Sequence, residues 1–309
     1  TTDDNARALL YLSLLPEGAR DEGLVRTYLA FLLHMQKEDG RFRNGLTLDG
    51  RFEDEGEAED PTGRAVLALA AAQRLPPPYA GPAREALLRA LPALEGFTSL
   101  RGRAYALLGL LALPKEPFLE AAEALGEGLL RAFREAEPAW PYPGPLTYAN
   151  HRPVEALYAY GLAFRRQEAV ALARRALAFL KEHYFTPGEE GLFFDPVGNR
   201  FMARGRDKPL FDQQPIEAKC ALLAHLRFGE RVLAEVAFLW FHGRNRLRAP
   251  LVDAFGPMDG LTPHGPNQNR GAEALLAYLL AWQALVQGVF PQVDEGVALG
   301  RVFALGGRP

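Results

Sequence analysis

The chain has 309 residues, and its hydrophobic content of 48% is enough to bury a substantial core in one large domain, 1–309. Its net charge of −3, from 35 basic and 38 acidic residues, argues against a nucleic-acid-binding protein. No apolar run is long enough to cross a bilayer, no signal peptide is visible, and the single cysteine excludes an intrachain disulfide. We therefore expect a cytoplasmic protein with no membrane or nucleic-acid partner. Arginine outnumbers lysine and the loops are rich in proline, a bias that suits a thermophile but also follows from a GC-rich genome.

A helical period of 3.6 residues runs through the chain, and two kinds of helix alternate along it. Largely apolar helices, which we expect to be buried, are predicted over Asn5–Leu15, Thr62–Arg74, Leu100–Ala112, Pro153–Phe164, Pro215–Phe228 and Ala272–Val286. Outer helices with one charged face are predicted over Gly23–Lys37, Ala83–Leu94, Pro117–Glu135, Glu168–His183 and Glu230–Phe241. Short strands are expected in Arg41–Phe52 and Leu192–Met202, whereas the tail, 287–309, carries only weak signals.

Inner and outer helices that alternate in this way form helical hairpins, which either remain an open solenoid or close into a ring. Two features favour the ring. The inner helices are too apolar to line a solvated concave surface, and the long loops precede inner helices. With six inner and about five outer helices, the sequence predicts an all-α fold, an (α/α)6 toroid of helical hairpins with its long loops on one rim.

The run Phe211–Glu217 places two carboxylates and two primary amides at the start of one inner helix. The free N–H groups and the positive end of the helix dipole favour polar or anionic groups there. Helix capping by Asp212, which lies near the expected N-cap, accounts for part of the pattern. Amides are indifferent caps, so Gln213 and Gln214 favour a functional polar cluster.

Polar side chains also precede the other inner helices, and in a ring these loops would meet over one central cleft. For Asp60, capping of the helix that follows is an equally good explanation. The predicted substrate-binding residues are Glu59, Arg64, Arg101, Trp140, Tyr142, Tyr148, Asn150, Arg152, Gln213, Gln214, Arg244, Asn245, Asp253, Asn267 and Asn269.

These residue types are the ones that a carbohydrate site requires. Sugar hydroxyls both donate and accept hydrogen bonds, which suits carboxylates and amides, and the C–H faces of pyranoses pack on Trp and Tyr. Paired carboxylates act as general acid and general base at a glycosidic bond. The catalytic candidates are Asp60, Asp212, Glu217 and Glu273.

Other chemistries find less support in the sequence. Zinc-ligand spacing, a Walker loop, a dinucleotide-binding glycine pattern and a G-x-S-x-G elbow are all missing, so we predict no cofactor and no metal. The acidic run Asp54–Asp60 lacks the spacing of an EF-hand. The segment Gln36–Phe42 resembles the repeat of terpene cyclases, but it occurs once, and the polar loops do not suit a hydrocarbon.

Several of these motifs together resemble a bacterial family of the six-hairpin glycosidase-like class, often fused to or annotated with group 1 glycosyltransferases. The resemblance covers roughly 41–286, and its most specific element is the D-Q-Q-P-I-E-A run, Asp212–Ala218. Its other motifs are Glu59-Asp60 with Gly63-Arg64, Leu146-Thr147-Tyr148 with Asn150, Gly243-Arg244-Asn245 and Asn267–Glu273. The resemblance implies an (α/α)6 toroid and a role with sugars. The chain departs from the family pattern at Pro61-Thr62 and carries no nucleotide-sugar Rossmann domain.

Three functions follow from this pattern. The first is a glycoside hydrolase acting on a mono- or oligosaccharide through paired carboxylates, with inversion favoured and the carboxyl groups roughly 6.5–9.5 Å apart. The second is a non-catalytic glycan-binding partner of a separate glycosyltransferase. The third is a sugar epimerase or lyase on the same fold, whose base would be His151, His242 or His264. A structural alternative is that the glutamates pair with Arg64, Arg101 or Arg152 as buried ion pairs.

Overall fold

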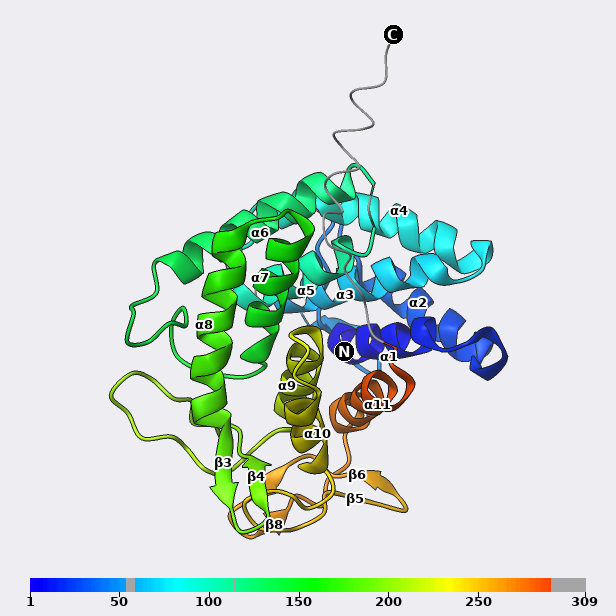
Figure 1. Cartoon of the computed structure of the whole chain (residues 1–309). Helices are drawn as coiled ribbons and strands as arrows, with labels where there is room; N and C mark the ends of the chain where they lie inside the picture. Colours follow the sequence, from blue (N-terminus) through cyan, green and yellow to red (C-terminus); the bar gives the residue numbers. More distant parts are fainter. Residues whose placement is uncertain (54–58, 114, 290–309) are drawn as a thin grey trace. The chain divides into compact units, whose positions relative to one another are not determined.

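The computed structural model describes residues 1–53, 59–113 and 115–289, and helices make up most of this part of the chain (Figure 1). Every predicted helix is present. The helices are α1 (Thr2–Leu14), α2 (Glu22–Met35), α3 (Glu59–Ala71), α4 (Pro77–Leu94), α5 (Leu100–Leu110), α6 (Phe118–Arg134), α7 (His151–Ala163), α8 (Gln167–Tyr184), α9 (Pro215–Arg227), α10 (Arg231–Leu239) and α11 (Ala272–Gln287). Two 3-10 turns, η1 (Glu17–Ala19) and η2 (Ala72–Arg74), follow α1 and α3. None of the described helices is long and apolar enough to span a bilayer.

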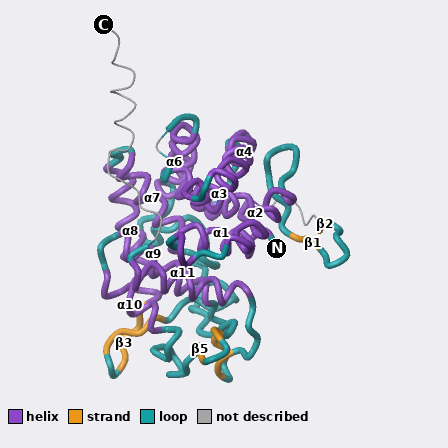
Figure 2. Tube along the Cα trace, turned by 90° about the vertical axis from the view of Figure 1, so that its right-hand side faces the viewer, coloured by secondary structure: helices purple, strands orange, loops and turns teal. Residues whose placement is uncertain are grey.

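The strands are short antiparallel hairpins within the loops, as Figure 2 shows in orange. The first, β1 (Gly45–Leu46) with β2 (Phe52–Glu53), lies close to where a strand was expected. The second, β3 (Phe185–Gly188) with β4 (Gly191–Phe194), begins before the expected segment Leu192–Met202. Two further hairpins, β5 (Val252–Asp253) with β6 (Gly256–Pro257) and β7 (Leu261–Thr262) with β8 (Gly265–Pro266), were not predicted. Strands of two residues are too short to show an alternating pattern in the sequence.

The described chain divides into two compact units, which we describe separately. The first comprises 1–130 and 156–170, and the second comprises 131–155 and 171–289, with the boundaries falling inside α6, α7 and α8. In the first unit α3 packs against both α1 and α5. Glycines let α3 and α5 approach closely, because a Cβ atom on Gly63 would lie 2.4 Å from the carbonyl oxygen of Gly102. Almost all of α3 is buried, as expected for an inner helix.

In the second unit α9 packs against both α10 and α11, and the three helices lie side by side in Figure 1. The residues of α9 from Pro215 to His225 are all buried, which confirms that α9 is an inner helix. Its neighbour α10 carries the exposed Val232 and Glu235 on one face and also contacts β4, as expected for an outer helix.

Candidate functional site

In the first unit, polar side chains join the starts of α1, α3 and α5. The guanidinium of Arg64 in α3 lies 2.6 Å from the Asp3 carboxylate in α1 and over the ring of Tyr105 in α5, 4.6 Å from its centroid. Burial alone lowers the pKa of Arg64, but Tyr105, Asp3 and Asp60 together raise it well above its usual value. Arg64 is therefore a permanent buried cation between three inner helices.

The two acidic residues that open α3 both bind the segment that enters α5. The Glu59 carboxylate accepts hydrogen bonds from the backbone N–H groups of Thr98, at 2.7 Å, and Ser99, at 2.6 Å. The Asp60 carboxylate accepts from the Ser99 hydroxyl at 2.7 Å and from Arg101 Nε at 3.2 Å. Asp60 lies in the first turn of α3, where acidic groups favour the helix dipole, rather than at an N-cap. Asp60 therefore forms an ion pair with Arg101 across the starts of α3 and α5.

In the second unit, hydrogen bonds join the starts of α7, α9 and α11. The Glu217 carboxylate, in the first turn of α9, accepts from the backbone N–H of Ala149, two residues before α7. Gln213, two residues before α9, forms a two-way backbone bridge with Leu261, with N···O distances of 3.1 and 3.0 Å. Asp259 accepts at 2.5 Å from the N–H of Gly271, the N-cap of α11. The starts of α9 and α11 are therefore both tied to the segment 259–261.

Asp212 lies in this joined region with an unusual backbone. Its φ is +60°, in the left-handed region, and its side chain is exposed. The N-cap of α9 is Gln214, whose side chain makes no capping bond, so the expectation that Asp212 caps the helix is wrong. Backbone contacts hold Asp212 on both sides: Phe211 packs on Gly198, where a Cβ atom would lie 1.8 Å from the Phe211 carbonyl oxygen, and Gln213 is bridged to Leu261.

Both polar atoms of the Gln213 side-chain amide form hydrogen bonds with protein groups. Its Nε2 donates to Asp195 Oδ1 and to the Leu210 carbonyl, both at 2.8 Å, and its Oε1 accepts from the indole of Trp240 at 2.9 Å. Gln213 is 1% exposed. The Gln213 side chain therefore anchors the backbone next to Asp212.

Asp195 is the centre of this anchor and was missed in the sequence. It is fully buried, and its carboxylate accepts from Arg246 Nη2 at 2.6 Å and from Lys208 Nζ at 2.8 Å. Burial raises the pKa of Asp195, but the hydrogen bond from Arg246 and the charge of Lys208 outweigh it, so the pKa is lowered. The local signal was weak, because Asp195 is a single acidic residue after Phe193-Phe194 in a segment expected to be a strand.

The remaining polar residues of the second unit fall into two groups. Asn150, Arg152 and Asn245 are buried and bonded to protein atoms: Asn150 to the Tyr184 hydroxyl at 2.7 Å, Arg152 to Glu155 at 2.5 Å, and Asn245 to the Trp240 carbonyl at 2.9 Å. Arg244 is half-buried and donates to the Glu190 carbonyl. The exposed or half-buried group contains Gln214, Asp253, Asn267, Asn269 and Glu273.

The three predicted aromatic residues differ in what they can offer a sugar. Trp140 packs edge-on against Phe179, with ring centroids 4.8 Å apart. Tyr142 is 2% exposed and packs edge-on against Phe133. Tyr148 is half-buried over Ala149, Ile216 and Cys220 at the start of α9, so only Tyr148 lies beside the predicted carboxylates of this unit.

Among the predicted bases, His151 is completely buried beside Tyr184, Phe194 and His225. His264 lies exposed in the turn between β7 and β8. His242 lies in the turn after α10, with its Nε2 atom 3.4 Å from the Tyr278 hydroxyl, and partial desolvation of the ring lowers its pKa below the usual 6.5.

Within 1–53, 59–113 and 115–289, no three His, Cys, Asp or Glu side chains gather as ligands for a metal ion. Residues 54–58 of the acidic run Asp54–Asp60 lie outside the described residues.

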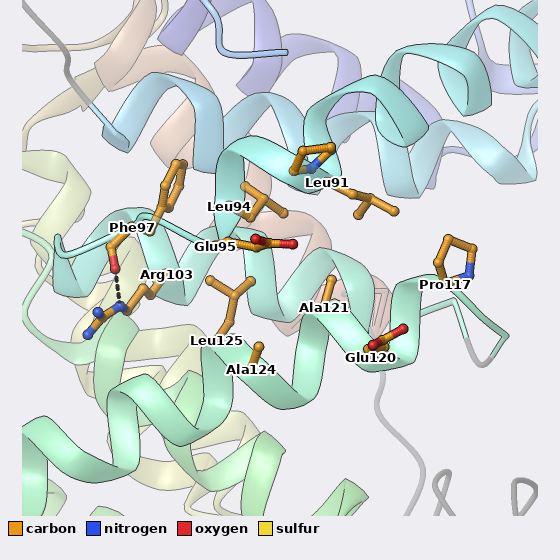
Figure 3. Close-up of a pocket in the computed structure, with 11 residues that line it drawn as sticks. Leu91, Leu94, Glu95, Phe97, Arg103, Pro117, Glu120, Ala121, Ala124 and Leu125 are labelled. Carbon is orange, nitrogen blue, oxygen red and sulfur yellow. Dashed lines mark hydrogen bonds between the residues drawn. The ribbon is translucent and has the colours of Figure 1, made fainter. Parts of the chain in front are cut away.

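The first unit also contains a cavity of about 350 Å³ between α4 and α6 (Figure 3). Leu91, Leu94, Phe97 and Leu125 give it a mainly apolar lining, and Arg103 Nε donates to the Phe97 carbonyl at 2.7 Å. No predicted site residue lines this cavity, and its apolar surface does not suit a sugar.

No protein-family model matches the chain, and no curated protein matches it. Solved structures do match. A cellobiose 2-epimerase from Spirochaeta thermophila is 14% identical, with 93% of this chain and 86% of the other covered at a TM-score of 0.59. A GH76 α-mannanase from Bacteroides thetaiotaomicron is 11% identical, with 93% and 86% covered at 0.59. An unsaturated glucuronyl hydrolase specific for heparin is 12% identical, with 84% and 71% covered at 0.54.

These likenesses identify the fold class. The chain has the all-α, (α/α)6 fold of helical hairpins that the sequence predicted, which is the fold of six-hairpin glycosidase-type proteins. The link to group 1 glycosyltransferases, implied by the resemblance in sequence, remains a prediction.

Proposed function

We propose that this protein hydrolyses glycosidic bonds with a pair of carboxyl groups at the starts of its inner helices. The observation that carries the proposal is Asp212, whose exposed carboxylate stands before α9 on a left-handed backbone that is fixed on both sides. Non-glycine residues in this conformation cluster at active sites, where the surrounding structure offsets their strain. Five further hydrogen bonds anchor the side chain of Gln213, the residue that follows Asp212, and the side chain of its partner Asp195.

The partner that we assign to Asp212 is Glu273, in the first turn of α11. The contacts of segment 259–261 with Gln213 and Gly271 support this pairing, because they bring the starts of α9 and α11 to the same segment. Asp212 is exposed, whereas Glu273 is half-buried. Two carboxyl groups in unlike environments are suited to the separate roles of base and acid.

The other two catalytic candidates keep supporting roles in this proposal. Glu217 is 1% exposed and bonded to the N–H of Ala149, which itself has a φ of +50°, so it holds the loop that carries Tyr148. Asp60, in the first unit, is bonded to the Ser99 hydroxyl and to Arg101, so we assign it a role in holding the entry to α5.

In the proposed step, one carboxylate takes a proton from water as the water oxygen forms a bond to the anomeric carbon. The glycosidic C–O bond breaks, and the leaving oxygen takes a proton from the other carboxyl group. A separation of roughly 6.5–9.5 Å between the two groups would leave room for the water and give inversion.

A second candidate function is epimerisation, and His242 is the observation that favours it. Because partial desolvation lowers the pKa of His242 below 6.5, its ring is mainly neutral at pH 7 and able to accept a proton, and Tyr278 lies within reach as a second polar group. In that reaction His242 would remove the proton on the carbon beside the carbonyl of an opened sugar, and the resulting enolate would take a proton on the opposite face of the same carbon.

One experiment separates these functions. The protein is incubated in D2O with α- and β-linked gluco- and manno-oligosaccharides of two to six units, and proton NMR follows the products. We expect new anomeric signals from shorter chains, which report hydrolysis. Loss of the C2 proton signal to deuterium without cleavage would instead assign epimerisation. If saturation-transfer NMR shows binding of a sugar that is neither cleaved nor exchanged, the protein would be a glycan-binding partner of a glycosyltransferase.

A further inference from the structure

The hairpin β5–β6 presents one aromatic ring to solvent. Phe255 lies in its two-residue turn and is 85% exposed, whereas the exposed Phe201 and Phe52 reach 45% and 39% within the described residues. Single apolar side chains are common on protein surfaces. What distinguishes Phe255 is how firmly its turn is held.

Two side chains fix the turn. The Asp253 carboxylate accepts from the backbone N–H of Phe255 at 2.8 Å. The guanidinium of Arg270 then joins both strands, because Nη2 donates to Asp253 Oδ2 at 2.7 Å and Nη1 donates to the Gly256 carbonyl. A planar fork bound at two points limits the orientations available to its partner.

The same arginine connects the hairpin to the proposed site. Arg270 directly precedes Gly271, the N-cap of α11, and Glu273 follows in the first turn. The strand β6 also contacts α11. Figure 1 shows β5 and β6 beyond the lower end of α11, where that helix begins. The turn with Phe255 is therefore fixed relative to the carboxyl group that we assign as one of the catalytic pair.

We propose that Phe255 is a stacking platform for a pyranose ring of an oligosaccharide whose neighbouring unit lies at Asp212 and Glu273. This inference rests on the proposed function. An aromatic face packs on the C–H face of a sugar, and a turn whose backbone is already held loses little conformational entropy on binding. Asp253 and Arg270 are 41% and 28% exposed in their side chains, so they offer an acceptor and a donor to the sugar hydroxyls beside the ring. Trp140 and Tyr142 pack against protein rings, so we assign Phe255 as an exposed aromatic face in addition to the half-buried Tyr148.

The test uses the full chain and maltohexaose, cellohexaose and mannohexaose as probes, with binding measured by saturation-transfer NMR and calorimetry. Phe255→Ala should weaken the hexasaccharide that wild type binds by roughly three- to tenfold. Phe255→Trp should bind at least as well as wild type, and Phe255→Leu should resemble the alanine variant. Val232→Ala removes another exposed apolar side chain, 72% exposed on α10, and should change nothing. All four variants should keep the wild-type melting temperature, because these positions are exposed.

The outcomes distinguish the two proposals. If wild type binds a hexasaccharide and Phe255→Ala binds it equally well, the platform is refuted and the proposed function stands. If Phe255→Leu keeps wild-type affinity, the contact is apolar packing and the aromatic platform is likewise refuted. If wild type neither binds nor cleaves any of the three, the proposed function fails and the platform fails with it.

Discussion

Substitution of Asp212 tests whether this residue contributes to activity or to stability. Asn adopts left-handed backbone at least as readily as Asp, and position 212 is exposed. The free energy of unfolding of Asp212→Asn should therefore lie within about 0.5 kcal/mol of the wild-type value. The rate of hydrolysis should fall by at least about 100-fold, because a proton-transfer group is lost. Melting curves and initial rates on the cleaved oligosaccharide measure both. A variant that loses several degrees of melting temperature and keeps full activity would make Asp212 a structural charge.

His151 predicts how stability depends on pH. Burial, with a smaller effect of His225, lowers the pKa of His151 well below 6.5, so the folded protein keeps the ring neutral. The unfolded chain binds a proton near pH 6.5, so the stability is complete above that pH and falls as the solution is acidified toward the folded-state pKa. The slope due to this residue is at most about 1.4 kcal/mol per pH unit.

Melting temperatures between pH 8 and pH 5 test this prediction. His151→Phe keeps an aromatic ring beside Tyr184 and Phe194 and removes the titration. We expect wild type to lose more stability on acidification than this variant. Parallel curves for the two proteins would show that His151 does not titrate on unfolding.

At the scale of elements, the segment that enters α9 depends on one glycine. A Cβ atom at Gly198 would lie 1.8 Å from the carbonyl oxygen of Phe211, so Gly198→Ala must displace the backbone beside Asp212. We expect a loss of roughly 1–3 kcal/mol in the free energy of unfolding, and a loss of activity larger than that destabilisation explains at room temperature. Gly18→Ala is the matched control, because nothing lies within 4 Å of its Cβ position. Urea unfolding and activity are measured for both variants. If Gly198→Ala and Gly18→Ala have the same stability and the same activity, the close contact between Gly198 and Phe211 does not position Asp212.

The helices were predictable as elements because each carries enough residues to show its period. The residues at which helices begin were harder to predict. The helix α3 begins three residues before the predicted Thr62, because Glu59 and Asp60 interact favourably with the helix dipole and bind the segment that enters α5. The hairpins β5–β6 and β7–β8 were not predicted, because strands of two residues show no alternation, and β5–β6 is joined by Arg270 from outside the hairpin.

At the scale of the whole molecule, the fold class could be derived from the alternation of apolar and amphipathic helices, and the solved structures of the same fold confirm it. The site was predictable only in part. The loop before α9 and the first turn of α11 carry two of the expected carboxylates, Asp212 and Glu273, and both helix starts are tied to segment 259–261. Asp195 and Trp240, which anchor Gln213, could not be found, because their partners lie 18 and 27 residues away in the sequence.

The most direct test of the proposed mechanism is a crystal structure of Asp212→Asn with an oligosaccharide that wild type cleaves. We predict a sugar unit at the starts of α9 and α11, with the side chain at position 212 and the Glu273 carboxyl group on opposite sides of the scissile bond, roughly 6.5–9.5 Å apart. A separation near 5 Å would indicate a retaining nucleophile instead. An oligosaccharide bound away from both side chains, for example in the cavity between α4 and α6, would contradict the assignment of Asp212 and Glu273 as the catalytic pair.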